Sequence, residues 1–384
     1  MRGLGWGLAF VLLAVCQPSV AAGELLAPEQ AEDRAAFVLT LRKARQGDVD
    51  AQWQAGLTYA RLAEDTRALP LLLAAAASGH APAASLAGSF LEDGRGEKRN
   101  LEDALRWYRQ AANDGEPAAQ AALARLLPAD APARLAYMRS AADSGNADGQ
   151  YLLGLQLGTN GASQAEGFEW LSRAATQGHL GAMLAAASQL ADGRGVRADR
   201  AAARRWLERA AKSGDPVANF LLGQARLRAE PADADGARAP LRVAASAGHR
   251  EAQYLYGELL ARGKAPEELR SARLWLEKAQ TQDHAAATNR LGELLRQDVA
   301  DAQQLARARA LFLQAAEQGN VDAMYNFADM QNVGLGGERD SMAALKWFNR
   351  AAEEKHEKAI EVLESLLGST IKTSSLGLKG FWQR

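Results

Sequence analysis

Hydrophobic and polar residues recur along this chain with a period of 30 to 36 residues. Each period contains a turn residue, glycine in eight of ten cases, which is followed by Asp, Glu, Asn or His. The ten turn residues are Gly47, Gly79, Gly115, Gly145, Gly178, Gly214, Gly248, Asp283, Gly319 and Lys355. A fixed period in this range is typical of a solenoid, in which each unit buries its apolar face only by stacking on its neighbours.

Small residues occupy fixed offsets from the turn residue. Alanine or glycine stands at offset 4 in every unit, and the residue at offset 9 is again small except for Glu364 in the last unit. The residues at offset 9 are Gly56, Gly88, Ala124, Gly154, Ala187, Gly223, Gly257, Gly292 and Ala328. Glycine inside a helix costs about 1 kcal/mol relative to alanine, so its recurrence predicts a close approach of two helix backbones.

Two amphipathic helices are predicted for each unit. The helix before the turn residue carries a large apolar residue eight positions earlier, often tryptophan, and the turn glycine ends that helix. In the helix after the turn residue, offsets 4, 7, 8, 11 and 12 form an apolar arc that we expect to be core. The pattern therefore predicts about nine antiparallel helix pairs.

This arrangement resembles the Sel-one-like repeat (SLR) family, a relative of the tetratricopeptide repeats. The resemblance is carried by three intact inter-helix loops, each followed by a tryptophan: Leu91–Gly96 with Trp107, Ala191–Val196 with Trp206, and Gly334–Gly337 with Trp347. It implies an all-α fold, an α/α solenoid with a right-handed superhelix of about nine two-helix repeats. Shortened loops, and Pro240 in place of the large apolar residue of its unit, depart from the family pattern.

The sequence divides into four segments. Residues 1–22 resemble a Sec-type signal peptide, with Arg2 before an apolar stretch and small residues before Gly23. Residues 23–47 are predicted to form an N-terminal capping helix, residues 48–367 the solenoid, and residues 368–384 a flexible C-terminal tail. We expect a periplasmic or secreted protein without a transmembrane segment after signal cleavage.

Cys16 is the only cysteine and would leave with the signal peptide. Lipoprotein anchoring at this cysteine is the less favoured alternative, because Val15 is too bulky for the position before a modified cysteine. With no cysteine in the mature chain, we expect no disulfide framework and no thiol nucleophile.

Charge and chemistry argue against nucleic acid as a partner and against catalysis. The net charge is −1 and the pI is near 6.6, which gives no basic footprint for nucleic acid. All five histidines directly follow a turn residue, one per unit, and we interpret them as exposed polar turn residues that cannot share a metal ion. No catalytic motif is present, so we expect no enzymatic activity, no cofactor and no metal site.

The helices after the turn residues offer a candidate binding face on the side opposite their apolar arc. Its residues lie at offsets 6 and 10, and in related folds the equivalent stripe lines the concave groove. The candidate partner-binding residues are Trp53, Arg125, Tyr151, Phe220, Gln224, Tyr254, Glu258, Asn289, Glu293, Tyr325 and Asp329. The alternative is that the aromatic residues pack between neighbouring helices and that the charged residues are simply solvated.

Two functions remain open from the sequence. The first is an exported, non-enzymatic adaptor that binds a protein or peptide through the concave face. The second is a structural scaffold of a cell-envelope assembly, such as one for polysaccharide export, held through its convex face and its C-terminal tail. Phe381 and Trp382 are the candidate docking residues of that tail.

Overall fold

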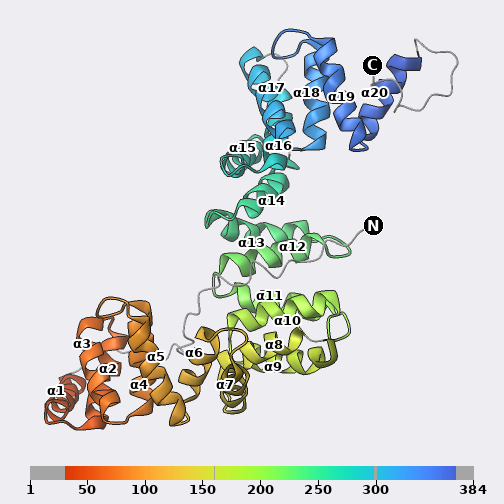
Figure 1. Cartoon of the computed structure of the whole chain (residues 1–384). Helices are drawn as coiled ribbons and strands as arrows, with labels where there is room; N and C mark the ends of the chain where they lie inside the picture. Colours follow the sequence, from red (N-terminus) through yellow and green to blue (C-terminus); the bar gives the residue numbers. More distant parts are fainter. Residues whose placement is uncertain (1–30, 160, 264, 298–300, 369–384) are drawn as a thin grey trace. The chain divides into compact units, whose positions relative to one another are not determined.

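The computed structural model describes residues 31–159, 161–263, 265–297 and 301–368. In these residues the secondary structure consists of twenty α-helices and one short 3-10 helix, without a strand (Figure 1). The chain divides into two compact units, Met1–Ala210 and Ala211–Arg384. The predicted signal peptide and the tail residues Phe381 and Trp382 lie outside the described residues.

Unit 1 begins with α1 (Ala31–Arg45) in the segment where a capping helix is predicted. We call the helices that follow a turn residue first helices and their partners second helices. The first helices are α2 (Val49–Arg61), α4 (Ala81–Asp93), α6 (Pro117–Leu126), α8 (Ala147–Gly158) and α10 (Leu180–Asp192). The second helices are α3 (Asp65–Ala77), α5 (Leu101–Asn113), α7 (Pro132–Asp143), α9 (Gln164–Thr176) and α11 (Arg200–Ala211), whose last residue belongs to unit 2. The short helix η2 (Gly161–Ser163) precedes α9.

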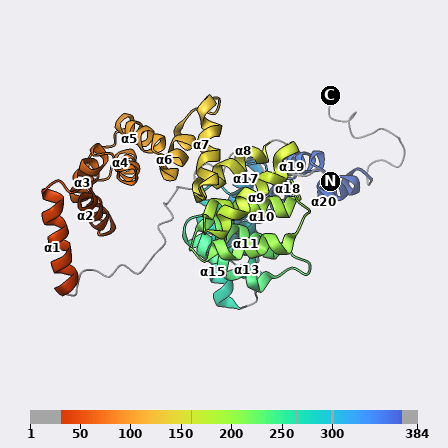
Figure 2. The same ribbon diagram turned by 90° about the horizontal axis from the view of Figure 1, so that it is seen from below.

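Unit 2 continues the alternation. Its first helices are α12 (Pro216–Leu227), α14 (Arg250–Ala261), α16 (Ala285–Arg296), α18 (Val321–Val333) and α20 (Glu357–Gly368). Its second helices are α13 (Ala234–Ser246), α15 (Pro266–Gln280), α17 (Ala302–Glu317) and α19 (Ser341–Glu353). Successive helices pack against each other from α1 to α10 and from α12 to α20, as Figure 2 shows for α2 to α5. The nine predicted helix pairs are therefore present.

The turn residues end the second helices as predicted. All ten have a positive φ, including the two that are not glycine, Asp283 at 58° and Lys355 at 66°. The residue that follows caps the next first helix in every unit, and its side chain accepts a hydrogen bond from a backbone N–H of that helix. The recurring sequence pattern thus encodes one helix stop and one helix start per unit.

The glycines at offset 9 receive a side chain from the following second helix. A Cβ added to Gly223 would lie 2.5 Å from Leu241 Cγ, and one added to Gly257 would lie 2.9 Å from Leu276 Cγ. The sequence predicts a close approach of two helix backbones at every glycine of offset 9. Only at Gly154 of α8 would an added Cβ lie within 3.0 Å of backbone atoms of the next helix. The contact residue lies seven positions before the next turn residue and is buried. The large apolar residues one position earlier are only half-buried, with the exceptions of Pro240 and Leu311.

The buried arc of the first helices differs from the predicted arc at two offsets. Offset 7, predicted to be core, is half-buried or exposed in all units and holds Arg290 and Asn326. Offset 5, which the pattern did not assign, is buried in most units and often carries an amide. Gln253, for example, is 4% exposed, and its Nε2 donates a hydrogen bond to the Ala245 carbonyl at 3.2 Å. These amides satisfy carbonyl groups at the end of the preceding second helix, which have no partner within that helix.

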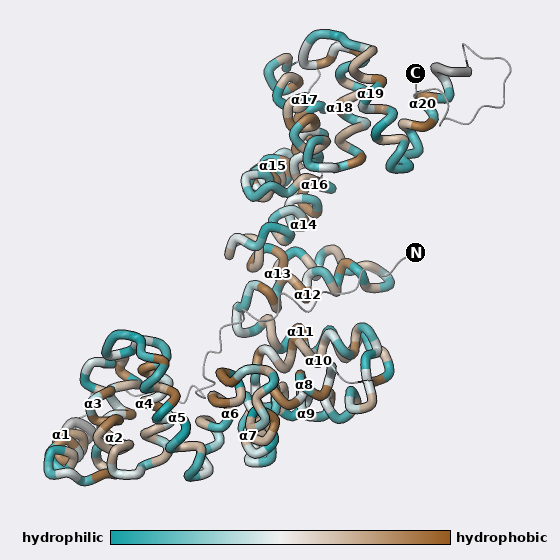
Figure 3. The backbone as a smooth tube through the Cα atoms, in the orientation of Figure 1, coloured by the Kyte–Doolittle hydropathy of each residue, from teal (hydrophilic) through white to brown (hydrophobic). Residues whose placement is uncertain are grey.

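Hydrophobic and hydrophilic residues alternate along the helices in both units (Figure 3). The buried residues form successive clusters between neighbouring helices, and most of them are alanine and leucine. Alanine allows close helix packing without loss of side-chain entropy, so the stack is held by many small contacts between neighbours. No helix in the described part of the chain is both long and apolar enough to cross a membrane.

Candidate interaction surface

The candidate binding residues lie on first helices, and we call this set the first-helix stripe. Most of them are half-buried, whereas Arg125 is exposed and Asn289 is buried. Trp53, Arg125 and Tyr151 belong to unit 1, and the other described members belong to unit 2. A half-buried aromatic side chain has a fixed position but keeps an accessible edge, which suits a recognition surface.

Each aromatic residue of the stripe packs on the histidine that caps the first helix of the next repeat. The distances between ring centroids are 5.0 Å for Trp53–His80, 4.4 Å for Tyr151–His179, 4.1 Å for Phe220–His249, 4.6 Å for Tyr254–His284 and 4.8 Å for Tyr325–His356. The angles between the ring planes are 19° to 31°. The alternative that the aromatics pack between neighbouring first helices is therefore partly right, since one face of each ring is covered.

The interpretation of the histidines as exposed turn residues is wrong. All five rings are half-buried, and each Nδ1 accepts a hydrogen bond from a backbone N–H at 3.0 to 3.2 Å. In three repeats the histidine Nε2 also lies near a carboxylate oxygen at offset 3 of the preceding first helix. These pairs are His179–Asp148 at 3.1 Å, His284–Glu251 at 2.8 Å and His356–Asp322 at 3.4 Å. A histidine here both caps its own helix and joins it to the previous one.

A polar network joins the charged residues of the stripe in unit 2. Arg290 of α16 lies between two carboxylates, with its Nε 2.6 Å from Glu258 Oε1 and an Nη 2.7 Å from Glu293 Oε2. Farther along α16, Arg296 lies 3.1 Å from Asp329 of α18. Three carboxylates against two guanidinium groups leave this surface acidic, although each carboxylate already has a cationic neighbour.

Asparagine side chains extend the network between α16 and α18. Asn289 Nδ2 donates a hydrogen bond to Glu293 Oε1 at 2.9 Å, and Asn289 Oδ1 accepts one from Asn326 Nδ2 at 3.0 Å. Burial, and then the carboxylate of Glu258, raises the pKa of Tyr254 above its ordinary value, so that its phenol stays neutral. The stripe residues of α14, α16 and α18 thus form one connected surface.

Arg290, Asn326 and Arg296 were not among the predicted residues, although they hold the network together. The signal for the first two was their polarity at offset 7, where five of the other units have leucine or valine. That offset had been assigned to the core, and two polar residues there argue against the assignment. Arg296 lies at offset 13 and has no such mark in the sequence.

In unit 1 the predicted residue Arg125 also pairs across first helices. Its Nη2 lies 2.7 Å from Glu92 Oε2, and Glu92 accepts a hydrogen bond from the Tyr108 hydroxyl at 3.0 Å. Burial, and then Glu92, raises the pKa of Tyr108 far above its ordinary value. Tyr108 therefore acts as a neutral hydrogen-bond donor here.

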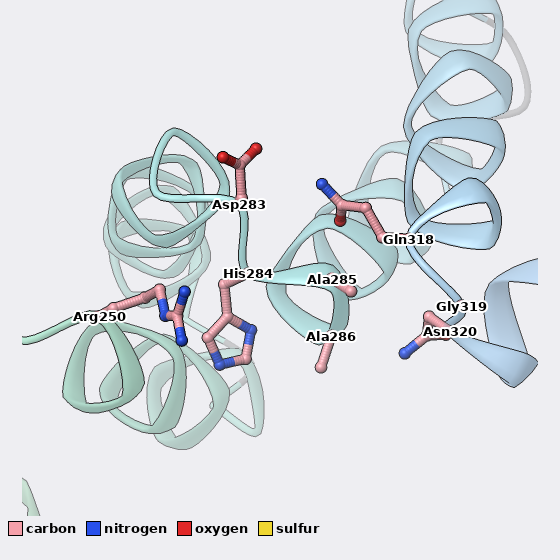
Figure 4. Close-up of a pocket in the computed structure, with 8 residues that line it drawn as sticks. All are labelled: Arg250, Asp283, His284, Ala285, Ala286, Gln318, Gly319 and Asn320. Atoms are coloured by element: carbon pink, nitrogen blue, oxygen red, sulfur yellow. The ribbon is translucent and has the colours of Figure 1, made fainter.

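A shallow pocket of about 360 Å³ lies beside this surface in unit 2, at the start of the first helices (Figure 4). Arg250, Asp283, His284 and Gln318 are among the residues that line it. Among the described residues, no cluster of histidine, cysteine and acidic side chains could hold a metal ion. The arrangement favours contact with a polypeptide over binding of a small molecule, because its aromatic and charged groups are spread over several helices.

The model of the Sel1 repeat matches this chain at residues 81–116, 147–179, 182–215, 250–284, 285–320 and 321–356. The search of curated proteins found no match to this chain. Among solved structures, a protective antigen of uropathogenic Escherichia coli strains with an SLR fold is 24% identical and has a TM-score of 0.52, covering 84% of this chain and 80% of its own. A Sel1 repeat protein from Oxalobacter formigenes is also 24% identical, with a TM-score of 0.45 and coverage of 86% and 91%. Because the repeat matches together span more than half of its residues, this chain belongs to the Sel1 repeat family.

Proposed function

We propose that this protein is an exported, non-enzymatic adaptor that binds a protein or peptide partner through the first-helix stripe. Sel1 repeat solenoids typically serve protein interaction. The observation that carries the proposal is the connected surface of α14, α16 and α18, where half-exposed aromatic rings lie beside a polar network. Export rests on the sequence of residues 1–22 alone.

The chemistry of the surface favours a partner segment with Arg or Lys beside an apolar residue. Tyr254 and Tyr325 offer ring edges to an apolar side chain, and the excess of carboxylates attracts a cation. A partner cation must compete with Arg290 and Arg296 for the carboxylates, which makes recognition depend on geometry as well as charge. We therefore expect binding that weakens with salt, because the Debye length is about 8 Å at physiological ionic strength.

The test compares three forms of the mature protein as bait in an envelope extract. The parent is expected to capture a partner that the double variant Tyr254→Ala with Glu258→Ala loses. Glu277→Ala is the matched control, since Glu277 pairs with Arg307 at 2.7 Å between second helices, away from the stripe. Thermal melts of all three forms show whether the variants remain folded.

Affinity for the identified partner is then measured at low and high salt. Equal affinity of the parent and the double variant would refute the proposal. In that case the second helices, or the tail with Phe381 and Trp382, become the better candidates for the contact surface.

A further inference from the structure

The five histidine junctions between successive first helices are of two kinds. At His179, His284 and His356 a carboxylate of the preceding first helix lies within 3.4 Å of Nε2. At His80 and His249 the structure shows the aromatic stack and the helix cap, without such an ion pair among the described residues. The two kinds respond differently to a proton.

A neutral imidazole satisfies every contact at these junctions. Its unprotonated Nδ1 accepts the backbone N–H of the first turn, and a proton on Nε2 can be donated to the carboxylate where one is present. Protonation adds a hydrogen to Nδ1, and this N–H then faces the backbone N–H that it previously accepted. Protonation also places positive charge at the positive end of the helix dipole. A neighbouring carboxylate offsets this loss by pairing with the imidazolium.

His249 lacks that compensation. The preceding first helix, α12, contains no Asp or Glu, and Val217 stands at the offset where the other kind of junction has its carboxylate. Of the carboxylates of α13, Asp235 lies 3.9 Å from Arg238 and Asp233 caps its own helix.

The charged groups that act on His249 are Glu251 and Arg250, both on its own helix α14. Glu251 is bound to His284 of α16 at 2.8 Å and so is already engaged. Phe220 of α12 covers the ring with a centroid distance of 4.1 Å, the shortest of the five. A proton on His249 therefore has no free carboxylate to pair with.

We propose that protonation of His249 releases the cap of α14 and opens the junction between α12 and α14, while the neighbouring junction at His284 holds. Acid thus loosens unit 2 at one defined place. Phe220 and Tyr254 lie on either side of this junction, so, if the proposed function is right, acid also disturbs the partner surface.

The sign of the pH dependence follows from the burial of the ring. Burial lowers the pKa of His249 below its ordinary value, and the smaller opposite effect of Glu251 does not cancel it. The unfolded chain therefore takes up this proton more readily than the folded chain. The stabilisation by this junction is complete above the ordinary histidine pKa of about 6.5 and is lost as the pH falls through the folded-state pKa.

The direct test is hydrogen exchange of the Ala252 amide, which donates to His249 Nδ1 at 3.2 Å. Its protection is measured by NMR at pH 7.5 and pH 5.5, after correction for the intrinsic pH dependence of exchange. In the parent we expect protection to fall by about five- to tenfold, the size of a lost helix cap. Unchanged protection in the parent would overturn the proposal.

His249→Asn keeps the cap and removes the titration. Asn146 and Asn320 occupy the same position in other units and cap their helices at 2.8 Å, so the chain itself provides the precedent. The variant should lose the acid response at Ala252, whereas His356→Asn should retain it, because His356 pairs with Asp322 and its loss leaves the Glu251–His284 pair intact. An equal response in His249→Asn and the parent would overturn the proposal.

Val217→Glu tests the missing carboxylate in the opposite direction. Val217 is 47% exposed, and the equivalent residues at the other four histidine junctions are acidic, so the substitution is expected to fold. It should reduce the acid response of Ala252, because the imidazolium gains a partner. A full response in this variant would contradict the explanation. None of these measurements needs the partner, so they can fail or succeed independently of the proposed function.

Discussion

Gly154 is the glycine at offset 9 where a single methyl group should disturb the packing of two helices most, because it alone in that set would meet backbone within 3.0 Å. It lies in α8 against α9, and a Cβ there would be 2.7 Å from Leu171 Cγ, 2.9 Å from the Gly167 carbonyl oxygen and 3.0 Å from Leu171 N. The two backbone atoms cannot rotate away as a side chain can. Gly154→Ala therefore forces α8 and α9 apart.

The magnitude follows from two opposing effects. Alanine gains about 1 kcal/mol over glycine in a helix interior, while overpacking a dense core costs about 1 to 3 kcal/mol. Because the clash is with backbone, we expect a cost in the upper half of that range. The net destabilisation is then about 1 to 2 kcal/mol, which corresponds to a fall in Tm of roughly 2 to 8 °C for a unit of this size.

The assay is thermal unfolding followed by circular dichroism, with urea titration as a second measure. Gly158→Ala in the same helix is the matched control, since its Cβ would meet only the flexible end of Gln189, at 3.1 Å. That variant should be neutral or up to about 1 kcal/mol more stable than the parent. If Gly154→Ala melts at or above the temperature of Gly158→Ala, the assignment of the small residues to helix contacts is refuted.

Three further predictions concern the stack, the buried amides and the compartment. Gly257→Leu should cost about 1 to 3 kcal/mol in thermal melts, because its Cβ would already press on a buried leucine of α15; a gain in Tm would contradict this. Gln253→Leu should cost about 1 to 3 kcal/mol in urea titration, because it removes the side-chain donor to the Ala245 carbonyl and the acceptor of the Gln282 amide, and leaves that carbonyl with the Gly248 N–H alone; an unchanged urea midpoint would show that the amide is dispensable. Mass spectrometry of the exported protein should find an N-terminus at or near Gly23 without lipid, and a diacylated Cys16 would reverse the expectation.

The repeat architecture could be predicted from the sequence because each unit repeats the same local instructions. A turn residue in the left-handed region, a capping residue after it and small residues at fixed offsets define both helices of a unit. Even Asp283 and Lys355, which replace the glycine, adopt the same backbone conformation. These helix stop and start signals lie within a few residues of each other, so they can be recognised without knowing which helices pack together.

The side-chain network was harder to predict because it depends on more than one helix. A helical wheel places offset 5 at the edge of a single apolar arc, yet each first helix packs against helices on two sides, and this buries Gln253 and its equivalents. The same geometry turns offset 7 outward, where Arg290 can reach Glu258 and Glu293. A periodicity analysis sees one helix at a time and so cannot assign these contacts.

The relation between the aromatic residues and the histidines was visible in the sequence, but only across the boundary between units. An aromatic residue at offset 6 is followed in all five cases by a histidine after the next turn residue. Where offset 6 holds Ser85, Ala121, Leu184 or Asn289, the next capping residue is Glu, Asn, Asp and Asn in that order. The co-occurrence has a physical reason, because an imidazole cap offers a flat face to the aromatic ring and the shorter caps do not.

One face of each ring is therefore used inside the array, and a partner can contact only the remaining face and the edge. Substituting a histidine by asparagine should therefore change the packing of the neighbouring aromatic ring, although the histidine is not itself a residue of the first-helix stripe. Substitutions of the capping histidines are thus as informative as substitutions of the aromatic residues in mapping the proposed surface.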